Sequence, residues 1–336
     1  MMHNVPMILA GDIGGTKTVI SLYARSASGA LQNVYLQTFP SQNYPTLETI
    51  LNEYLEQAPR HVLKSACFGV AGAVVMGQCR TTNLPWSLSE RGLAETLGIP
   101  TVKLLNDLEA AAYGMLFIGA HERVVLNPGK ANASGNIAVI AAGTGLGEAM
   151  LYWDGTRHHP IASEGGHCDF SPRTDREIEL LKYLRQRLNG HVSYERILSG
   201  PGLYNVYQFL RDSGYGSEPG WLGEELRGGD PSATISRQAL SGKDPLCAAA
   251  LDMFVAIYGA EAGNLALKCL AVGGVYIGGG IAPQILPALT RDTFMDAFLD
   301  KGRFAPLMRD MPVYVATNSQ APLLGAAHYA ARLAND

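Results

Sequence analysis

The chain has 336 residues, a length that fits two compact domains of about 100–200 residues each. Hydrophobic residues make up 47% of it and charged residues 17%, which is the composition of an ordinary globular protein with a sizeable core. The formal net charge is −4 and no run of Lys or Arg occurs. These two features argue against a nucleic-acid partner, because binding a phosphate backbone requires a basic face.

The cysteines and the apolar segments indicate in which cellular compartment the protein is found. The five cysteines are Cys67, Cys79, Cys168, Cys247 and Cys269. Their number is odd and no CxxC spacing occurs, which argues against a disulfide framework and a structural zinc site. Residues 1–12 lack the basic segment of a signal peptide, and the longest uncharged run, 269–290, is broken by five Gly and two Pro. We therefore expect a cytoplasmic protein that does not associate with a membrane.

The first third of the chain predicts strands that end in glycine or in polar residues. Residues 7–24 read as an apolar strand, a glycine turn and a second strand, which together indicate a β-hairpin. The segments that follow predict a helix, two strands and another helix, at 45–58, 65–72, 101–107 and 108–119.

The same arrangement starts again at Asn136. Residues 136–155 again read as strand, glycine turn and strand, and a third glycine turn follows the strand that begins at 275. The remaining segments predict helices at 174–188, 246–270 and 321–334 and a strand at 312–317. The helix at 246–270 is apolar on more than one face, so we expect it to be buried. Residues 213–234 are rich in Gly, Ser and Pro and read as a surface excursion.

The two hairpin turns have the composition of phosphate-binding loops. Consecutive backbone N–H groups in a glycine turn form a concave site for anions, and a Cβ would block the approach of phosphate oxygens. Residues 11–17 and 142–147 fit this use. A Walker loop is excluded because Thr16, and not Gly, stands immediately before Lys17. A dinucleotide fingerprint is excluded because residues 143–147 lie between two predicted strands and do not open a helix. A plain hairpin turn remains the alternative.

Asn106 and Asp107 follow an apolar strand, at the edge of the sheet where α/β proteins bind ligands. A carboxylate there could take the proton of a sugar hydroxyl, which is a poor nucleophile by itself. The alternative is a helix N-cap, since Asn and Asp are favoured caps.

A short polar segment, 163–169, carries Glu164 and His167, which could hydrogen-bond adjacent sugar hydroxyls. A metal site is the alternative reading, but a second pair of ligands is missing. Glu195 taken alone would be an ordinary solvated carboxylate.

Taken together, these segments closely resemble the bacterial glucokinase family of the non-ROK type. The matching segments occur in the family's order and cover essentially the whole chain. They are GDIGGT (11–16), LLNDLEA (104–110), AAGTGLG (141–147), EGGHCDF (164–170), GHVSYERILSGPGL (190–203), GGGIAP (278–283) and DKGRF (300–304). The zinc signature of ROK kinases is absent after His167, whereas Lys17 is commoner among ROK proteins and its role stays open.

The resemblance implies an α/β protein with the two-domain actin-like ATPase (ribonuclease H-like) fold and a ligand cleft between the domains. The small domain would comprise 7–118 plus 319–336, and the large domain 119–318. The protein would be a cytoplasmic glucokinase, likewise expected to form a homodimer. It would transfer the γ-phosphoryl group of ATP, with Mg²⁺, to the 6-hydroxyl of glucose, giving glucose 6-phosphate and ADP at the entry to glycolysis.

The resemblance also implies roles for individual residues. Asp107 would be the catalytic base, and Asp12 would hold Mg²⁺ through water. The other sugar contacts would be Asn106, Glu164, His167 and Glu195. The ATP phosphates would lie against Gly11, Asp12, Ile13, Gly14, Gly15, Thr16, Gly143, Thr144 and Gly145, and the adenosine near Gly279 and Gly280.

Three other functions remain open at this point. The closest is a kinase for another hexose or an N-acetylated hexose. A regulator that senses sugar without turnover would usually carry a DNA-binding helix-turn-helix, and only six residues precede the first predicted strand. A structural actin-like ATPase would not need the segments at 164–170 and 190–203.

Overall fold

A computed structural model describes residues 6–27, 29–59, 62–130 and 132–334. Its internal contacts divide the chain into two compact units. The first comprises Met1–Gly119, His159–Ala162 and Asn318–Asp336, and the second comprises Ala120–His158 and Ser163–Thr317. The domain bounds 7–118 plus 319–336 and 119–318 stay a prediction, and residues 335–336 of that prediction lie outside the described residues.

The first unit is built on a five-stranded sheet in the order β3-β2-β1-β4-β8. Its strands are β1 (Pro6–Ile13), β2 (Lys17–Arg25), β3 (Leu31–Pro40), β4 (Val62–Val70) and β8 (Thr101–Asn106). β1 and β2 pair antiparallel, so the hairpin predicted at 7–24 is confirmed. β1, β4 and β8 run parallel, and their carboxyl ends therefore lie at one edge of the sheet. A small sheet follows, of β5 (Val74–Val75), β6 (Gln78–Arg80) and β7 (Ser87–Ser89).

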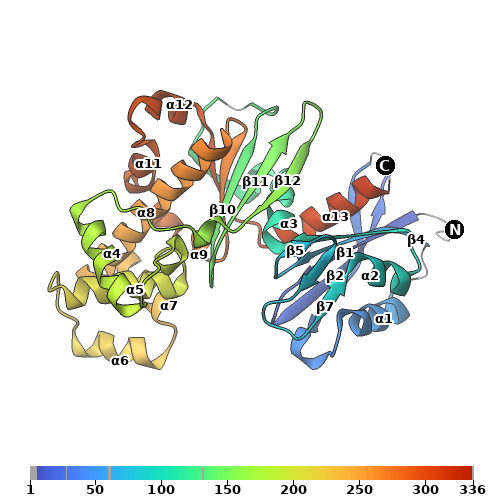
Figure 1. Ribbon diagram of the computed structural model, residues 1–336, viewed down its shortest axis with the longest axis horizontal. Coiled ribbons are helices and arrows are strands. Elements are labelled where there is room, and N and C mark those ends of the chain that lie inside the picture. Colours follow the sequence, from blue (N-terminus) through green and yellow to red (C-terminus); the bar gives the residue numbers. More distant parts are fainter. Residues whose placement is uncertain (1–5, 28, 60–61, 131, 335–336) are drawn as a thin grey trace. The chain divides into compact units, whose positions relative to one another are not determined.

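Helices cover both faces of the five-stranded sheet (Figure 1). They are α1 (Leu47–Gln57), α2 (Glu90–Leu97), α3 (Asp107–Gly114) and α13 (Ala321–Leu333). α1 and α2 cover one face, where their leucines share a core with Leu9 and Phe68. α3 and α13 cover the other, where their alanines pack on Ile8 and Ala10. Because side chains alternate along a strand, Asp12 belongs to the face that α3 and α13 cover.

α3 and α13 touch backbone to backbone. A Cβ added at Gly114 would overlap the carbonyl oxygen of Ala321, and one added at Gly325 would overlap that of Ala110. The predicted helix at 108–119 ends earlier, at Gly114, and the next residues form a turn. Close packing of small residues thus holds α3, whose first residue is Asp107, against the sheet.

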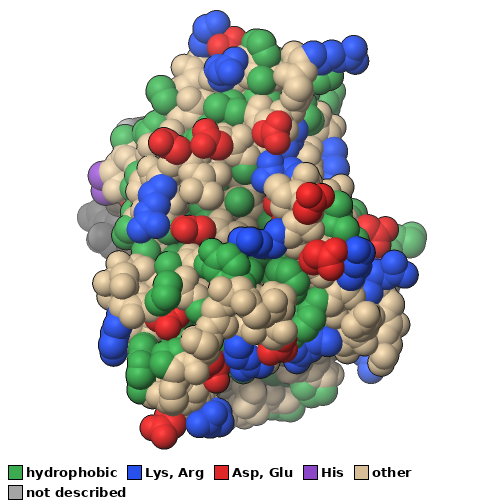
Figure 2. All heavy atoms as spheres, turned by 90° about the vertical axis from the view of Figure 1, so that its left-hand side faces the viewer, with side chains coloured by type: hydrophobic (Ala, Val, Ile, Leu, Met, Phe, Trp, Pro, Cys, Tyr) green, Lys and Arg blue, Asp and Glu red, His purple; other side chains and the backbone are tan. Residues whose placement is uncertain are grey.

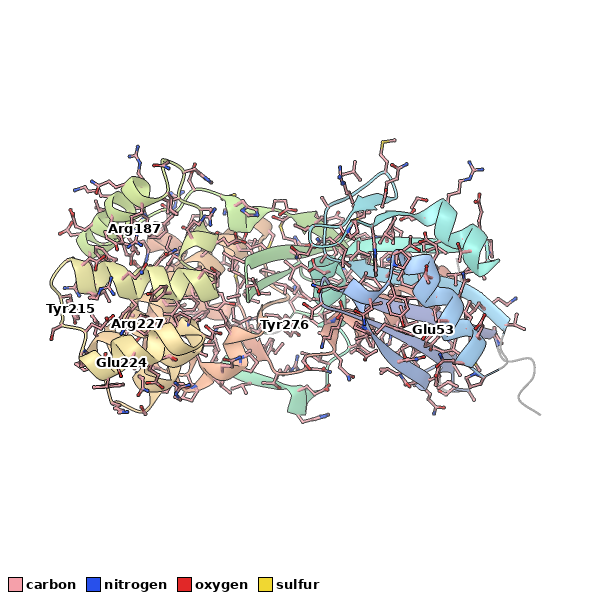
Figure 3. All side chains as sticks on the ribbon, turned by 90° about the horizontal axis from the view of Figure 1, so that it is seen from below. Glu53, Arg187, Tyr215, Glu224, Arg227 and Tyr276 are labelled. Carbon is pink, nitrogen blue, oxygen red and sulfur yellow. The ribbon has the colours of Figure 1, made fainter. Side chains whose placement is uncertain are left out.

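A six-stranded sheet has the order β12-β11-β10-β13-β14-β9, and all of it except residues 159–162 of β12 belongs to the second unit. Its strands are β9 (Arg123–Asn127), β10 (Ile137–Ala142), β11 (Leu146–Trp153), β12 (His158–Ser163), β13 (Gly274–Gly278) and β14 (Val313–Ala316). β10 and β11 pair antiparallel, which confirms the second predicted hairpin. β10, β13 and β14 run parallel. Towards the β9 edge, Arg123 donates a 3.1 Å hydrogen bond to the hydroxyl of Tyr276 on β13 (Figure 3).

Helices make up most of the rest of this unit. They are α4 (Asp175–Arg187), α5 (Gly200–Asp212), α6 (Gly220–Gly228), α7 (Pro231–Leu240), α8 (Pro245–Cys269), α9 (Ile281–Gln284), α10 (Leu286–Leu289), α11 (Asp292–Leu299) and α12 (Ala305–Asp310). Short 3₁₀ helices along the chain are η1 (Ser41–Asn43), η2 (Ala120–Glu122), η3 (Gly165–His167), η4 (Tyr194–Arg196) and η5 (Gly302–Phe304).

α8 is the central helix of the second unit, packed on α5, α7, α11 and the sheet, as Figure 1 shows. Of the helices among the described residues, it is the one long and apolar enough to cross a membrane, yet 72% of its most apolar window is buried inside the unit. This burial is that of a core helix, as its apolar composition predicts.

The predicted surface excursion at 213–234 is mostly exposed or half-buried, and much of it is helical. This segment contains α6 and the start of α7 (Figure 1), and Leu222 and Leu226 of α6 are buried in the core. Three glycines in α6 lower its helix propensity, but the burial of its two leucines outweighs that cost. The segment lies beside a pocket described below.

We predict that Gly325→Ala lowers the stability of the first unit by about 2–3 kcal/mol, because the new methyl group must push α13 away from α3. The midpoint of urea unfolding should fall accordingly. Gly228→Ala is the matched control, since a Cβ at this helical glycine meets nothing within 4 Å. Equal midpoints for the two variants would contradict this account of the helix contact.

Candidate active-site residues

The turn between β1 and β2 is held by backbone and hydroxyl contacts. Gly14 donates to the carbonyl of Lys17 at 3.0 Å, and the Ser41 hydroxyl donates to the carbonyl of Gly14 at 2.7 Å. Gly11 lies within the strand, where a Cβ would come within 2.6 Å of Phe68 Cδ1. Packing alone therefore accounts for Gly11, whereas Gly14, Gly15 and Thr16 form the turn that could face phosphate.

Asp12 and Asp107 are neighbours across the carboxyl edge of the first sheet. The register pairs Asp12 with Gly69 of β4 and Gly69 with Leu105 of β8, two residues before Asp107. Because Gly69 has no side chain, little separates the two carboxyl groups. Burial, and then the negative charge of Asp107, raise the pKa of Asp12 to about 6, while Lys17 opposes this rise. A cation beside Asp12 would favour its ionised form.

The helix cap next to Asp107 is Asn106. Its side-chain oxygen accepts from the amide of Leu108 at 2.9 Å, and Glu109 reaches back to the amide of Asn106 at 2.9 Å, which completes a capping box. The Asn106 amide nitrogen also donates to the carbonyl of Gly72 at 3.1 Å. The N-cap role that sequence alone left open for Asp107 thus belongs to Asn106, and Asp107 stands at the first position of α3.

The turn between β10 and β11 is tight and borders a pocket of about 560 Å³. The amide of Gly143 donates to the carbonyl of Gly145, and the amide of Gly200 donates to the carbonyl of Gly143, both at 2.8 Å. The pocket is lined by Gly143, Thr144, Gly200, Pro201, Tyr204, Asp230, Pro231, Ser232, Ala233, Gly280, Ile281 and Gln284.

The glycines around this pocket have different physical causes. Gly279 has φ +83°, and a Cβ there would collide with the backbone of Ala142, so the fold itself requires glycine. A Cβ on Gly143 or Gly280 meets nothing within 4 Å, although both residues line the pocket. Open space above a glycine in a pocket wall is what a closely approaching ligand would need.

The second unit brings together the two polar turns singled out in the sequence. Backbone hydrogen bonds join them: Tyr194 donates to the carbonyl of Cys168 at 3.0 Å, and Phe170 donates to that of Val192 at 2.9 Å. Glu164 and His167 on the first turn are exposed, and Glu195 on the second is half-buried.

The Glu195 carboxylate accepts a 3.1 Å hydrogen bond from the amide of Leu146, at the start of β11. A Cβ on Gly145 would lie 2.5 Å from the same carboxylate oxygen. Glu195 therefore sits directly on the glycine turn, which local sequence alone did not indicate.

The predicted site residues are thus divided between the units. The first unit holds residues 11–16, Asn106 and Asp107, and the second holds 143–145, Glu164, His167, Glu195, Gly279 and Gly280. Sequence reasoning missed the pocket residues of α5 and α7. A signal was present in the segments SGPG (199–202) and GDPS (229–232), each a capping residue followed by Pro at a helix start.

Known proteins share this chain's sequence over nearly its full length. The sequence profile of the glucokinase family matches residues 9–333. A glucokinase of Nostoc sp. is 42% identical over 341 residues, covering 97% of this chain and 99% of that protein. A glucokinase of Psychromonas ingrahamii is 38% identical and covers 96% of both chains.

Solved structures agree. The crystal structure of a glucokinase from an Antarctic psychrotroph has a TM-score of 0.86 and 32% identity, and covers 99% of this chain and 100% of that one. A ROK family glucokinase from Streptomyces griseus shares the fold, with a TM-score of 0.61 and 20% identity over 97% of this chain and 99% of its own. The predicted non-ROK type and the actin-like ATPase fold are confirmed. The chain therefore belongs to the glucokinase family, and it is an ATP-dependent hexose kinase.

Proposed function

We propose that this chain transfers the γ-phosphoryl group of ATP to the 6-hydroxyl of glucose in the cytoplasm. One observation carries the proposal. The turn between β10 and β11 borders the pocket through Gly143 and, three residues later, donates from Leu146 to Glu195. A candidate sugar ligand is thus hydrogen-bonded to the hairpin that carries a candidate phosphate loop, within the second unit.

The pocket beside Gly143 is proposed to take the adenosine of ATP. Its volume suits a nucleoside, since ligand pockets commonly measure about 300–1,000 Å³. Tyr204 and Ile281 offer apolar surface, and Asp230, Ser232 and Gln284 offer hydrogen-bonding groups. The related Streptomyces griseus structure holds glucose and AMPPNP, which supports a nucleotide and a sugar as the two substrates.

Glu164 and His167 are proposed to bind glucose hydroxyls together with Glu195 and Asn106. The first two are exposed on one short turn, and the backbone pairing of η3 with η4 brings Glu195 next to them. Carboxylates can accept from several sugar hydroxyls at once, and hydrogen bonds to charged groups contribute about 1.5–3 kcal/mol each. The Asn106 side chain already caps α3, so its contribution to sugar binding would be added to a structural one.

Magnesium is proposed to enter with ATP and to lie near Asp12 through water. Among the described ranges, no group of three His, Cys, Asp or Glu side chains could hold a metal ion, so a cage made by protein alone is not indicated. A single buried carboxyl group with a raised pKa fits a cation that arrives with phosphates. When bound, Mg²⁺ would neutralise charge on the phosphates, and Asp12 would orient its hydration shell.

Asp107 is proposed as the base. Its carboxylate takes the proton of the 6-hydroxyl, the hydroxyl oxygen forms a bond to the γ-phosphorus, and the bond from phosphorus to the leaving oxygen of ADP breaks. Asp107 stands at the N-terminus of α3, where the partial positive charge of the helix end favours the carboxylate form.

The remaining expectations are a homodimer and the absence of nucleic-acid and membrane partners. The face drawn in Figure 2 shows acidic and basic side chains interspersed, with no continuous basic surface, which supports the expected absence of a nucleic-acid partner. The predicted small and large domains correspond in this proposal to the first and second units.

The test of the proposed function is turnover with a panel of sugars. Purified protein with ATP, Mg²⁺ and glucose should form glucose 6-phosphate, detected with a coupled enzyme. Mannose, fructose and N-acetylglucosamine serve as competing substrates. Efficient turnover of one of these, without turnover of glucose, would refute the substrate assignment.

For the base, Asp107→Asn should lower kcat about 10²–10⁴-fold, because the amide cannot accept the hydroxyl proton. The helix should survive, since Asn106 supplies the cap. Saturating kinetics and circular dichroism measure the two effects. A kcat within about threefold of the parent would remove Asp107 from the mechanism.

For the nucleotide pocket, Gly143→Ala should raise the KM for ATP about tenfold or more, because the new methyl group occupies space that phosphate or ribose needs. The melting temperature should not change, since that methyl group meets no protein atom within 4 Å. Gly220→Ala, equally open and absent from the pocket lining, is the control and should leave both quantities as in the parent. An unaltered KM for ATP in Gly143→Ala would place the phosphates elsewhere.

A further inference from the structure

Two acidic side chains inside the second unit have no role in the function proposed above. Glu148 on β11 is 1% exposed and Glu261 on α8 is 0% exposed. The negative charge of Glu261 acts on the carboxyl group of Glu148, so a proton shared between the two would relieve their repulsion. Oε1 of Glu148 has no hydrogen-bond partner among the described residues. Such a pair costs free energy to bury, so its presence calls for a role.

The charges around the pair come from several elements. Lys268 Nζ lies 3.3 Å from Glu261 Oε1, and Asn264 Nδ2 donates to Glu261 Oε2 at 2.8 Å. Further titratable groups that act on the pair or on Lys268 are Tyr258 of α8, Tyr194 of η4, Lys301 after α11, and Cys168 after η3. One close cation thus faces two carboxyl groups. Burial, and then the charge of Glu261, raise the pKa of Glu148 to about 7.

The pair contacts both polar turns, the one that carries Glu164 and His167 and the one that carries Glu195. A Cβ on Gly165 would overlap Oε2 of Glu148, so the turn between Glu164 and His167 rests directly on that carboxyl group. On the other side, Asn264 Nδ2 donates both to the hydroxyl of Tyr194 at 3.2 Å and to Glu261 Oε2 at 2.8 Å, and so links Tyr194 to Glu261. Tyr194 immediately precedes Glu195 in the chain.

We propose that Glu148 and Glu261 are positioning residues that share one proton and hold the turns of Glu164, His167 and Glu195 in the geometry that binds sugar. The inference rests on the proposed function, since it assigns a role to residues beneath the proposed sugar ligands. The shared proton holds β11 next to α8. Through the contacts at Gly165 and Tyr194, this link fixes the positions of the two turns relative to each other.

Loss of the proton breaks the link. Two buried carboxylates then repel each other with one lysine to compensate, and the contacts at Gly165 and Tyr194 shift apart. Since the pKa of Glu148 is raised, the neutral form is present below about pH 7 and is lost as the pH rises through that value. The affinity for glucose should therefore fall above neutral pH, while the KM for ATP, which depends on the other side of the hairpin, changes less.

The experiment compares the parent with Glu148→Gln and Glu148→Leu. In the parent, the KM for glucose should rise about tenfold from about pH 6.5 to about pH 8.5, as the neutral fraction of Glu148 falls. Glu148→Gln keeps a permanent neutral donor to Glu261, so its KM for glucose should stay flat within about twofold over that range. Glu148→Leu removes the donor and should raise the KM for glucose about tenfold at both pH values, with the KM for ATP within about twofold.

Glu224→Gln, on the exposed surface of α6 (Figure 3), is the matched control and should follow the pH profile of the parent. His167 and the other titrating groups are the same in all four proteins, so a difference between profiles reports on Glu148. If Glu148→Leu does not fold, the flat profile of Glu148→Gln still decides.

A Glu148→Gln profile that rises in parallel with the parent's, or a parent KM that does not change with pH, overturns the inference. So does a Glu148→Leu variant that folds and keeps the parent's KM for glucose. If the parent forms no glucose 6-phosphate, the proposed function fails and this inference fails with it. If the parent does form it, the pH profiles test this inference alone.

Discussion

Close backbone contact around residues 142–148 is the constraint on which the second unit depends. Four glycines bring other segments against this stretch of β10 and β11: Gly279 against Ala142, Gly145 against Glu195, Gly166 against Leu146 and Gly165 against Glu148. A Cβ at any of these positions would force the neighbours apart. Neighbouring segments therefore pack against the hairpin on several sides, and this packing fixes the positions of the residues in contact with it. Preorganisation of this kind is what phosphoryl transfer requires, because positioning supplies most of its catalysis.

Buried carboxyl groups repeat in both units, with different counter-charges. In the first unit, Asp12 lies near Asp107 at an open sheet edge, where Lys17 and a cation that accompanies nucleotide can approach. In the second, Glu148 and Glu261 are enclosed, and Lys268 is the close cation. An acidic pair at an edge can respond to a ligand, whereas an enclosed pair must resolve its repulsion by keeping a proton. Two acidic pairs in different surroundings are thus proposed for two different roles, one in catalysis and one in positioning.

Much of this arrangement could be predicted from sequence. The alternation of apolar residues around glycine turns was enough for both hairpins, and the uniform apolar character of 246–270 was enough for a buried α8. Sequence could not tell why a given glycine is present. Gly11 and Gly279 are required by packing, whereas Gly143 and Gly280 face open space, and only the neighbours in the fold distinguish these cases.

Long-range contacts account for what sequence did not indicate. The helix α6 was not predicted in the surface excursion because it is rich in glycine, and two leucines buried in a core built by distant segments stabilise it. The local sequence around Glu195 and Glu148 does not indicate a role for either residue. Each is placed by a contact with a residue more than fifteen positions away in the chain, Glu195 with Leu146 and Glu148 with Gly165. The three proposed sugar ligands of this unit were recognisable through family resemblance, but the groups beneath them were not.

The capping of α3 shows how a structural role can create a chemical one. Asn106 takes both the N-cap and the tether to Gly72, which fixes the direction in which the next residue leaves the strand. Asp107 then stands in the first turn, where its Oδ1 accepts from the amide of Leu108 at 2.9 Å and the helix dipole stabilises negative charge. Its neighbour Asp12 lies on β1, and burial raises its pKa to about 6. Two carboxyl groups with unequal surroundings can take different roles, as proposed here for Asp107 as the base and Asp12 beside a cation.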